Sequence, residues 1–532
     1  MNKIKIRLKR ISVLIISLFF ISNLLISIFL VNETYIEERS GKILNTAATS
    51  ANTNLEEWNT KWGGKDRDEP NEFIVDSSNN VYIVGYTESY GNGGADIVVI
   101  KYKNMIEYEW DFIWGGSNDD FGYDIVMDLS GDIYITGSTS SFGNGDSDII
   151  IIKYNSVGEQ LWNRTWGGIN KDLATKILID SSNDIYIVGR TESYGNGALD
   201  IVVIKYNSIG DQLWNRTWGG IDYDVGYDAI LDSSNNLYIS GVIGMIQVGD
   251  VYGHKYLIRG DVFLVKLNGL GEELWNNTWG TAYGDYAYKI AIDSSNNIYI
   301  TGAYKIRYML EPYIPYGADI FLSKYSASGT LFWNETWGSA HHEESWDLAI
   351  SSLDYVYILV WIDEPAPSYL DNSSITLVKF NRTGEYLWDE SWSDYDGENF
   401  PVEIEFGFND NLFILGDTCS YIKDDIDIVV LHYNITGEFL WDKKWNESSK
   451  CDQCFDMYID VFDNIYILGE TWNDSDGSDI DMVLIKYSYS SGIENEIPSD
   501  IIFLIMILSL TSLIIIILTL QKRISNPAKV IQ

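Results

Sequence analysis

The sequence contains little of the material from which disulfide frameworks, metal centres and histidine-based active sites are built. It has three cysteines and four histidines among 532 residues. Three cysteines exclude a disulfide framework as the main source of stability, and four histidines argue against a His-containing catalytic triad. The motifs GxSxG and HExxH and a phosphate-binding glycine loop are absent from the chain. The sequence therefore favours a non-enzymatic function.

Positive charge and proline are scarce as well. The chain has 36 Lys and Arg against 77 Asp and Glu, a formal net charge of −41. Nucleic acid is thereby excluded as a partner, because its binding requires basic residues that displace counterions. We interpret the acidity as a solvated surface that keeps the protein soluble, with calcium capture and adaptation to high salt as alternatives. Eight prolines but 45 glycines favour many tight turns over disordered linkers.

Long apolar runs are confined to the two ends of the chain. Residues 1–31 combine five basic residues among the first ten with an uncharged stretch from Ile11 to Val31. This predicts a signal peptide or a retained N-terminal membrane anchor, and the sequence leaves both open. Residues 501–520 predict a transmembrane helix, and the basic residues after it predict a cytoplasmic tail at 521–532. The protein is thus expected at the cell membrane, single-pass or two-pass, with the segment between its ends on the extracytoplasmic side.

Three sequence patterns recur through that segment, always in the same order. They are Asp-Ser-Ser-Asn-Asn-(Val/Ile/Leu)-Tyr-Ile, Asp-Ile-Val-Val-Ile-Lys-Tyr and Leu-Trp-Asn-Arg-Thr-Trp-Gly-Gly, each with variations. The first pattern recurs at intervals of 52 to 61 residues. Its aromatic residue is Tyr82, Tyr134, Tyr186, Tyr238, Tyr299, Tyr357, Phe413 and Tyr466; the lysine position of the second is Lys101, Lys153, Lys205, Lys266, Lys324, Lys379, His432 and Lys486; the first tryptophan of the third is Trp58, Trp110, Trp162, Trp214, Trp275, Trp333, Trp388 and Trp441.

Each repeat unit predicts four short strands. In one unit they are residues 123–128, 133–137, 148–154 and 160–166, with a turn at 129–132 and another at 155–158. The third strand is almost entirely apolar, as expected for a strand that is covered on both faces. No helical periodicity occurs between the two apolar ends. Four-stranded units repeated in series predict a β-propeller.

The repeats begin and end out of phase. Trp58 and Trp62 belong to a fourth strand with no earlier strands before it, whereas residues 455–487 supply three strands with no tryptophan strand after them. Pairing these two segments completes an eighth blade and removes the exposed edges of an open array. We therefore predict an all-β fold, an eight-bladed β-propeller over residues 51–490 whose last blade is closed by the N-terminal strand. Linkers at 32–50 and 491–500 connect it to the hydrophobic terminal helices.

The repeat pattern Trp-Gly-Gly, Asp-Ser-Ser-Asn-Asn-Ile-Tyr-Ile-Thr-Gly and Asp-Ile-Leu-Ile-Lys-Tyr resembles the bacterial and archaeal β-propeller repeat family of the SBBP type. The resemblance covers roughly residues 51–490. It implies a propeller of the kind that is common in cell-surface proteins and that has no single activity. That family is usually described with seven blades, so a count of eight departs from it. Residues 153–162 also resemble, more loosely, the repeats of pyrroloquinoline-quinone enzymes.

The length variation among repeats predicts a binding face. Connections between the second and third strands share one face of a propeller with the connections between blades, and they lengthen at 242–260, 303–318 and 361–373. Insertions confined to one face often mark the binding face of a repeat protein, although neutral drift in tolerant loops remains an alternative. Aromatic residues beside Arg suit recognition of protein or carbohydrate. The candidates are Tyr252, His254, Tyr256, Arg259, Arg307, Tyr308, Tyr313, Tyr316, Trp361 and Tyr369.

No cofactor is predicted, and calcium is the open alternative. Residues 473–481 place hard oxygen ligands around a glycine, and the candidate ligands are Asp474, Asp476, Asp479 and Asp481. The repeated Asp-Ser-Ser-Asn-Asn segments are interpreted as hairpin turns, because Asp and Asn bond their own backbone. Residues 341–344 (His-His-Glu-Glu) form a transition-metal site or a set of exposed loop residues. For Cys451 and Cys454 a local disulfide or two free thiols is favoured over zinc, and the sequence assigns Cys419 no role.

Asparagine sequons agree with an extracytoplasmic location. Several of them share one repeat position, so duplication explains part of their number. The predicted N-glycosylation sites are Asn32, Asn163, Asn215, Asn276, Asn334, Asn372, Asn381, Asn434, Asn446 and Asn473.

The predicted function is that of a membrane-anchored propeller that presents a binding or adhesion surface to a cell-surface protein or glycan, without catalysis. A propeller enzyme of the quinoprotein type is the enzymatic alternative, although the adjacent cysteine pair of many quinoproteins is missing. A structural component of a surface layer is the third. Fold alone does not choose among them.

Overall fold

The computed structural model describes residues 56–488, except for 252–253, 308–316, 365–371, 395–396, 421–424, 448–450 and 474–476. The predicted anchor, linkers, transmembrane helix and tail at 1–50 and 491–532 lie outside these residues. Within the described ranges, no helix is both long and apolar enough to cross a membrane.

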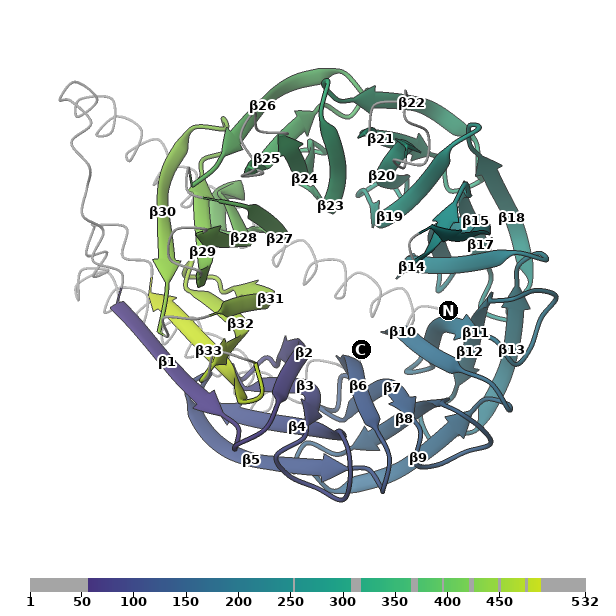
Figure 1. Cartoon of the computed structure of the whole chain (residues 1–532), viewed down its shortest axis with the longest axis vertical. Helices are drawn as coiled ribbons and strands as arrows, with labels where there is room; N and C mark the ends of the chain where they lie inside the picture. Colours follow the sequence, from purple (N-terminus) through teal and green to yellow (C-terminus); the bar gives the residue numbers. More distant parts are fainter. Residues whose placement is uncertain are drawn as a thin grey trace, which may run out of the picture. The chain divides into compact units, whose positions relative to one another are not determined.

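Eight antiparallel sheets follow one another around a ring, as Figure 1 shows. Each sheet is a blade of four strands. In blades 1–7 these pair in chain order, and in blade 8 the N-terminal β1 is added to β31, β32 and β33. The strand nearest the central channel is the first strand in blades 1–7 and β31 in blade 8. Blade 4 carries an additional strand, β16, which pairs with an extension of β15. The predicted all-β, eight-bladed architecture is confirmed.

The strands divide among the blades as follows. Blade 1 contains β2 (Asp68–Val75), β3 (Val81–Thr87), β4 (Asp96–Lys103) and β5 (Glu107–Trp114); blade 2 contains β6 (Asp120–Met127), β7 (Ile133–Thr139), β8 (Asp148–Tyr154) and β9 (Gln160–Trp166); blade 3 contains β10 (Asp172–Ile179), β11 (Ile185–Thr191), β12 (Asp200–Tyr206) and β13 (Gln212–Trp218); blade 4 contains β14 (Tyr223–Leu231), β15 (Leu237–Val251), β16 (His254–Ile258), β17 (Asp261–Leu267) and β18 (Glu273–Trp279).

The second half of the ring continues in the same way. Blade 5 contains β19 (Gly284–Ile292), β20 (Ile298–Arg307), β21 (Gly317–Tyr325) and β22 (Leu331–Trp337); blade 6 contains β23 (His342–Ile350), β24 (Val356–Glu364), β25 (Asn372–Phe380) and β26 (Tyr386–Trp392); blade 7 contains β27 (Asn399–Phe406), the 3-10 turn η1 (Phe408–Asp410), β28 (Leu412–Ser420), β29 (Asp425–Tyr433) and β30 (Phe439–Trp445); blade 8 contains β31 (Asp452–Ile459), β32 (Ile465–Trp472), β33 (Ile480–Ser488) and β1 (Glu56–Trp62).

The hydrophobic core lies between blades rather than within one. The second and third strands of each blade are buried on both faces; in β8, for example, every residue from Asp148 to Tyr154 is buried. One core cluster joins Val84 and Val99 of blade 1 to Ile135 and Ile150 of blade 2. Because each face of a blade packs against the next blade, the ring gains stability when it closes and leaves no apolar face uncovered.

Blade 8 is built from both ends of the described chain. Strand β1 pairs with β33 along its whole length, from Glu56 opposite Ser488 to Trp62 opposite Met482. Figure 1 shows the purple β1 beside the yellow β33. Trp58 and Trp62 pack on the core cluster between blades 8 and 1. The predicted completion of the eighth blade by the N-terminal strand is therefore confirmed.

The two sides of the disc differ in their connections. On one side, which we call the turn face, the first and second strands and the third and fourth strands are joined by short turns of nearly constant geometry. Asp76 Oδ1 accepts hydrogen bonds from the backbone N–H of Ser78 at 2.7 Å and of Asn80 at 2.9 Å, and Asn79 has a positive φ of 60°. This is the hairpin-turn role that the sequence predicts for the repeated aspartate.

The lysine that recurs in the second pattern lies beneath this face. Lys205 Nζ donates to Tyr186 Oη at 2.8 Å and to Asp180 Oδ2 at 3.1 Å, so one buried cation ties the second and third strands to the turn. In blade 7 the pair is replaced as a unit, and Phe413 stacks on His432 with ring centroids 4.4 Å apart. Burial lowers the pKa of His432 to about 4, so its ring is neutral and suits this apolar stack.

Candidate functional site

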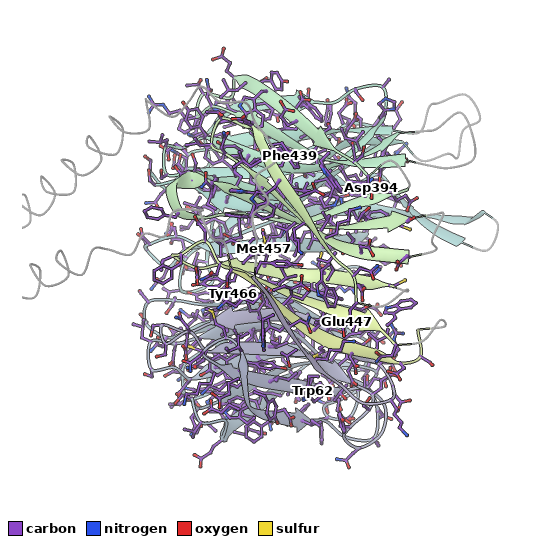
Figure 2. The ribbon with its side chains drawn as sticks, turned by 90° about the vertical axis from the view of Figure 1, so that its left-hand side faces the viewer. Trp62, Asp394, Phe439, Glu447, Met457 and Tyr466 are labelled. Atoms are coloured by element: carbon purple, nitrogen blue, oxygen red, sulfur yellow. The ribbon has the colours of Figure 1, made fainter. Side chains whose placement is uncertain are left out.

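The opposite side of the disc, which we call the insertion face, carries the second-to-third connections and the connections between blades. There β15 continues to Val251 and pairs back with β16, so part of the segment predicted as a loop is a β-hairpin. Figure 2 shows strands projecting beyond the disc on this side, toward which Asp394 and Glu447 lie, whereas Tyr466 lies toward the other side. β20 and β24 are also lengthened before their connections. Length variation is therefore concentrated on this face.

Half of the ten predicted binding residues belong to the described part of the chain. Arg259 is exposed beside the hairpin, and its carbonyl accepts a hydrogen bond from Tyr286 Oη at 3.3 Å. Trp361 lies within β24, not in a loop, and stacks on Phe400 at 5.9 Å with an interplanar angle of 17°. His254, Tyr256 and Arg307 lie in β16 and β20. The remaining candidates lie outside the described residues: Tyr252, Tyr308, Tyr313, Tyr316 and Tyr369.

The calcium candidate at 473–481 is described only in part. Asp474 and Asp476 lie outside the described residues. Asn473 Nδ2 donates to Asp479 Oδ1 and to Asp481 Oδ2, both at 2.7 Å, so the two described carboxylates are held together by an amide. Cys419, Cys451 and Cys454 form no disulfide, and the N–H of Cys454 donates to Asp417 Oδ1 at 3.0 Å.

The His-His-Glu-Glu segment is not an exposed loop. His342 and Glu343 begin β23 and are buried. His342 Nε2 is 3.0 Å from Glu344 Oε1, and Glu343 Oε1 accepts a hydrogen bond from the Ser339 N–H at 2.9 Å. The expectation of solvent exposure was wrong because the inner strand of blade 6 starts earlier than the repeat pattern indicates.

The described sequons lie on the outermost strands, on the turn face and on the insertion side of the disc. Asn163, Asn215, Asn276 and Asn334 lie on the outermost strands, where Asn276 and Asn334 are exposed. Asn381 and Asn434 begin turns on the turn face, and their Oδ1 atoms accept hydrogen bonds from those turns. Asn372 begins β25, and Asn446 and Asn473 are exposed on the insertion face.

A ring of charged side chains lines the central channel, and the sequence analysis did not identify it. The innermost strand of every blade has a β-bulge, and the residue that follows the bulge is charged in all eight blades. Such bulges commonly redirect a side chain. The members are Glu72, Asp124, Lys176, Asp228, Lys289, Asp347, Glu403 and Asp456, and we call this set the channel ring.

Most carboxylates of the channel ring join neighbouring blades. Asp124 Oδ2 accepts a hydrogen bond from the Ile177 N–H at 2.7 Å, and Glu403 Oε2 accepts one from the Met457 N–H at 2.7 Å. Each bond satisfies a backbone group that the bulge of the next blade leaves without a strand partner. Further links of this kind run from Ile290 to Asp228, from Ile404 to Asp347 and from Phe73 to Asp456.

The two lysines of the channel ring lie on one side of it, and the other side carries only carboxyl groups. Lys176 and Lys289 flank Asp228, and Lys289 Nζ is 3.5 Å from Asp347 Oδ1. The other side of the ring, through blades 6, 7, 8, 1 and 2, is entirely acidic. Burial raises the pKa of Asp124 to about 7 and, together with the charge of Asp347, raises that of Glu403 to about 8. Carboxyl groups with pKa values near neutrality inside a channel are typical of functional sites, and also of structural networks.

Aromatic residues accompany these charges. The bulge residue that precedes the charged position is aromatic in five blades. Tyr227 and Trp346 are 38% and 39% exposed, and Tyr227 contacts Tyr288 of the next blade with ring centroids 5.3 Å apart. Exposed aromatic faces beside carboxylates form a surface on which an amphipathic ligand stacks and donates hydrogen bonds. The five residues are Tyr123, Tyr227, Tyr288, Trp346 and Phe455.

One signal in the sequence would have revealed the channel ring. Each charged residue stands ten positions before the aromatic residue of the first repeat pattern, as Glu72 does before Tyr82 and Asp456 before Tyr466. The bulge obscured this signal, because it breaks the two-residue alternation by which strand residues are assigned to a face.

A cavity of about 300 Å³ separates blades 3 and 4 near the rim of the disc. Here the third strand has Leu267 after its repeat lysine, where blades 1, 2, 3, 5, 7 and 8 have a tyrosine such as Tyr206. Ile201, Val203 and Trp218 line the cavity beside Leu267. The smaller leucine leaves the space that a ring fills elsewhere. The cavity is thus a packing defect of one blade rather than part of the channel.

Comparison with known proteins agrees with this architecture. A β-propeller repeat model matches residues 271–303. An uncharacterized WD repeat-containing protein of Acanthamoeba polyphaga mimivirus is 20% identical over 496 residues, which cover 68% of this chain and 36% of that protein. Regulatory protein FlaEY of Caulobacter vibrioides is 23% identical over 172 residues, covering 29% of this chain and 18% of FlaEY. The chain thus spans well under half the length of these relatives.

The similarity to solved structures is weak. Polysaccharide lyase Uly1 is 11% identical with a TM-score of 0.39, covering 84% of this chain and 94% of the lyase. The apocarotenoid oxygenase of Synechocystis is 9% identical with a TM-score of 0.40, covering 74% of this chain and 94% of the oxygenase. Their activities carry no implication at this level of similarity, and the resemblance to quinone enzymes stays a prediction. The repeat match and the closed ring of blades together identify the chain as a β-propeller repeat protein.

Proposed function

We propose that this protein is a non-enzymatic, membrane-anchored propeller on the extracytoplasmic side, and that its insertion face binds a cell-surface protein or glycan. The observation that carries the proposal is the contrast between the two faces. The turns of one face repeat with little variation, whereas the other face gains a hairpin in blade 4 and lengthened strands in blades 5 and 6. Scaffolds that bind through one face concentrate variation there.

The positions of the two ends of the propeller support binding through the insertion face. By the repeat pattern, β33 ends and β1 begins at the turn face, because the third and fourth strands of the other blades are joined there. The ends of the described chain thus lie at the turn face, so the insertion face is left free for a partner.

The channel ring extends the binding surface inward. Tyr227 and Trp346 supply exposed rings, and the neighbouring Asp228 and Asp347 supply acceptors. Sugars stack their apolar faces on aromatic rings and donate hydroxyl hydrogen bonds to carboxylates. This chemistry favours a glycan, or a peptide with a basic or hydroxylated side chain, as the ligand group that enters the channel.

Shortening the hairpin tests the proposal. Residues 244–260 are replaced by residues 140–147, the short connection of blade 2, in the full-length chain. We expect binding to a glycan or protein array to fall at least tenfold, because the projecting strands that form the contact are removed, while the thermal unfolding midpoint stays close to that of the parent chain.

The matched control changes the turn face. Leu270 is 68% exposed there, and Leu270→Ser is expected to leave the array profile unchanged. Equal binding by the shortened variant and the parent chain, or a loss caused by Leu270→Ser alone, would assign recognition to a surface other than the insertion face.

A further inference from the structure

Three consecutive junctions between blades bring two buried aspartates together beneath the insertion face. One aspartate begins the third strand of a blade, and the other is the first or second residue of the first strand of the next blade. All six are at most 1% exposed. The pairs are Asp96 with Asp120, Asp148 with Asp172, and Asp200 with Asp224, and we call them the junction pairs.

The two carboxylates of each junction pair converge on one glycine. A Cβ atom on Gly115 would lie 1.7 Å from Asp96 Oδ1 and 2.8 Å from Asp120 Oδ2. A Cβ on Gly167 would lie 1.8 Å from Asp148 Oδ1 and 2.8 Å from Asp172 Oδ2. The first glycine of the Trp-Gly-Gly pattern is therefore required, since any side chain would displace the carboxylates from this common point.

Three of the four oxygens at the first junction have partners. Asp96 Oδ2 accepts a hydrogen bond from the Asn92 N–H at 2.7 Å, and Asp120 Oδ2 accepts one from the Gly116 N–H at 2.8 Å. Asp120 Oδ1 accepts one from Thr139. Asp96 Oδ1 is buried without a hydrogen-bond partner, and so is Asp148 Oδ1 at the next junction. A buried charged oxygen without a partner is costly, so each of these atoms indicates a missing partner.

The missing partner must be positive, because the nearest charge to each of these aspartates is another carboxylate. Asp120 raises the electrostatic energy of ionised Asp96, and Asp172 does the same for Asp148. No ion pair joins Asp96, Asp120, Asp148 or Asp172 to a lysine or arginine of the described chain. Two facing buried carboxylates without such a neighbour require a shared proton or a bound cation.

The junction between blades 6 and 7 shows what happens without the charges. Ser374 and Asn399 occupy the two aspartate positions, and Asn399 Nδ2 donates to the carbonyl of Ser373, the residue before Ser374, at 2.7 Å. The Asn399 N–H donates to Ser373 Oγ at 2.6 Å. The glycine is replaced as well, by Ser393. Both acids and the glycine are thus exchanged together for neutral residues, and the amide of Asn399 is satisfied by main-chain carbonyls. The joint exchange indicates that the two acids and the glycine act as one unit around something they bind.

We propose that each junction pair binds a hard divalent cation of the Ca²⁺ class between its two carboxylates. Carboxylate oxygens are the preferred ligands of such ions, and two aspartates supply up to four of the six to eight that calcium takes. Main-chain carbonyls and water complete the shell, in keeping with the absence of any cluster of three or more His, Cys, Asp or Glu ligands in the described ranges. The cation joins the third strand of one blade to the first strand of the next, and so it fixes the floor of the insertion face.

Metal titration of the full-length chain tests this proposal. The protein is freed of metal with EDTA and titrated with Ca²⁺ by calorimetry, and with Tb³⁺ by luminescence excited through tryptophan, since Trp114 and Trp166 directly precede the two glycines. We expect three ions per chain, one for each junction pair, and a rise of the thermal unfolding midpoint with Ca²⁺. Asp96→Asn combined with Asp120→Asn is expected to lower the stoichiometry by one.

Two further variants keep the test decisive. Asp128→Asn removes a buried carboxylate of blade 2 that serves a turn on the opposite face, and it is expected to leave the stoichiometry unchanged. Asp148→Asn with Asp172→Asn provides a second junction in case the first double variant fails to fold. If the parent chain binds no Ca²⁺ or Tb³⁺, or if both junction variants keep the parental stoichiometry, the carboxylates share a proton and the proposal is overturned.

Discussion

Deletion of residues 51–64 is expected to open the ring and to lower the midpoint of thermal unfolding by roughly 5–10 °C. The deletion removes β1 and with it Trp58 and Trp62, which pack on the core between blades 8 and 1. Loss of two half-buried tryptophans costs on the order of 5 kcal/mol, below the sum for fully buried rings. Strand β33 is then left as an unpaired edge, which favours association with other chains. Differential scanning calorimetry and light scattering measure the two effects.

The control returns the strand to its place by another route. A variant that carries residues 55–64 after Ser488, joined through the turn sequence of residues 155–158, has the connectivity of the other blades. It is expected to recover the parental midpoint and to remain monomeric. A truncated chain that unfolds at the parental temperature would show that β1 contributes nothing to closure.

Replacement of Lys289 by Met has the second largest expected effect. The carboxylate of Asp347 raises the pKa of Lys289, which also faces Asp228 and Glu403. Removal of the cation leaves these carboxylates facing one another. The lysine side chain is 40% exposed in the channel, so we expect a loss of about 1–3 kcal/mol at pH 8, less than the loss for a fully buried pair. Denaturant unfolding followed by tryptophan fluorescence measures it.

The effect of Lys289→Met depends on pH in a defined direction. Glu403 has a pKa of about 8 and Asp124 one of about 7 in the folded protein, whereas such groups titrate near 4 when unfolded. Between about pH 4 and pH 8 the folded chain therefore holds more protons than the unfolded chain, and stability falls as the pH rises. At pH 5 Glu403, which faces Lys289 and Asp347, is largely neutral, so the variant is expected to lose less stability than at pH 8.

A surface lysine serves as the comparison. Lys171 is exposed at the insertion face, and Lys171→Met is expected to change stability by less than about 0.5 kcal/mol at either pH. If Lys289→Met destabilises equally at pH 5 and pH 8, the carboxyl groups of the channel ring do not titrate in this range, and the electrostatic description of the channel is wrong.

The fold could be predicted from the sequence because each blade repeats the same pattern of strands and turns. Strands β8 and β9 have the bounds that the pattern predicts, Asp148–Tyr154 and Gln160–Trp166. The first strand of the same blade starts at Asp120 rather than Tyr123. The error arises because Asp120 is polar and yet fully buried, held by hydrogen bonds at the junction rather than by apolar packing. A prediction from the hydrophobic pattern alone does not identify a buried polar residue of this kind.

The candidate sites were harder to predict from the sequence, because they form between blades. The channel ring and the junction pairs consist of residues from different blades that meet only when neighbouring blades pack, as Asp124 meets Ile177 and Asp96 meets Asp120. Within one repeat each of these acids looks like a strand-end residue. The sequence shows that these residues recur at fixed positions of the repeat. It does not show that they contact a residue of the neighbouring blade.

The most direct test of the account is a disulfide across the seam of blade 8. Lys61 lies opposite Val483 in the pairing of β1 with β33, and residues directly opposite one another in antiparallel strands have the separation that a disulfide requires. The variant with Lys61→Cys and Val483→Cys is predicted to cross-link nearly completely under mild oxidation, as measured by mass spectrometry of the digested chain. Lys61→Cys with Val98→Cys, the equivalent position of blade 1, is predicted to remain unlinked. Linkage of the second pair, or none of the first, would contradict an eight-bladed ring closed by the N-terminal strand.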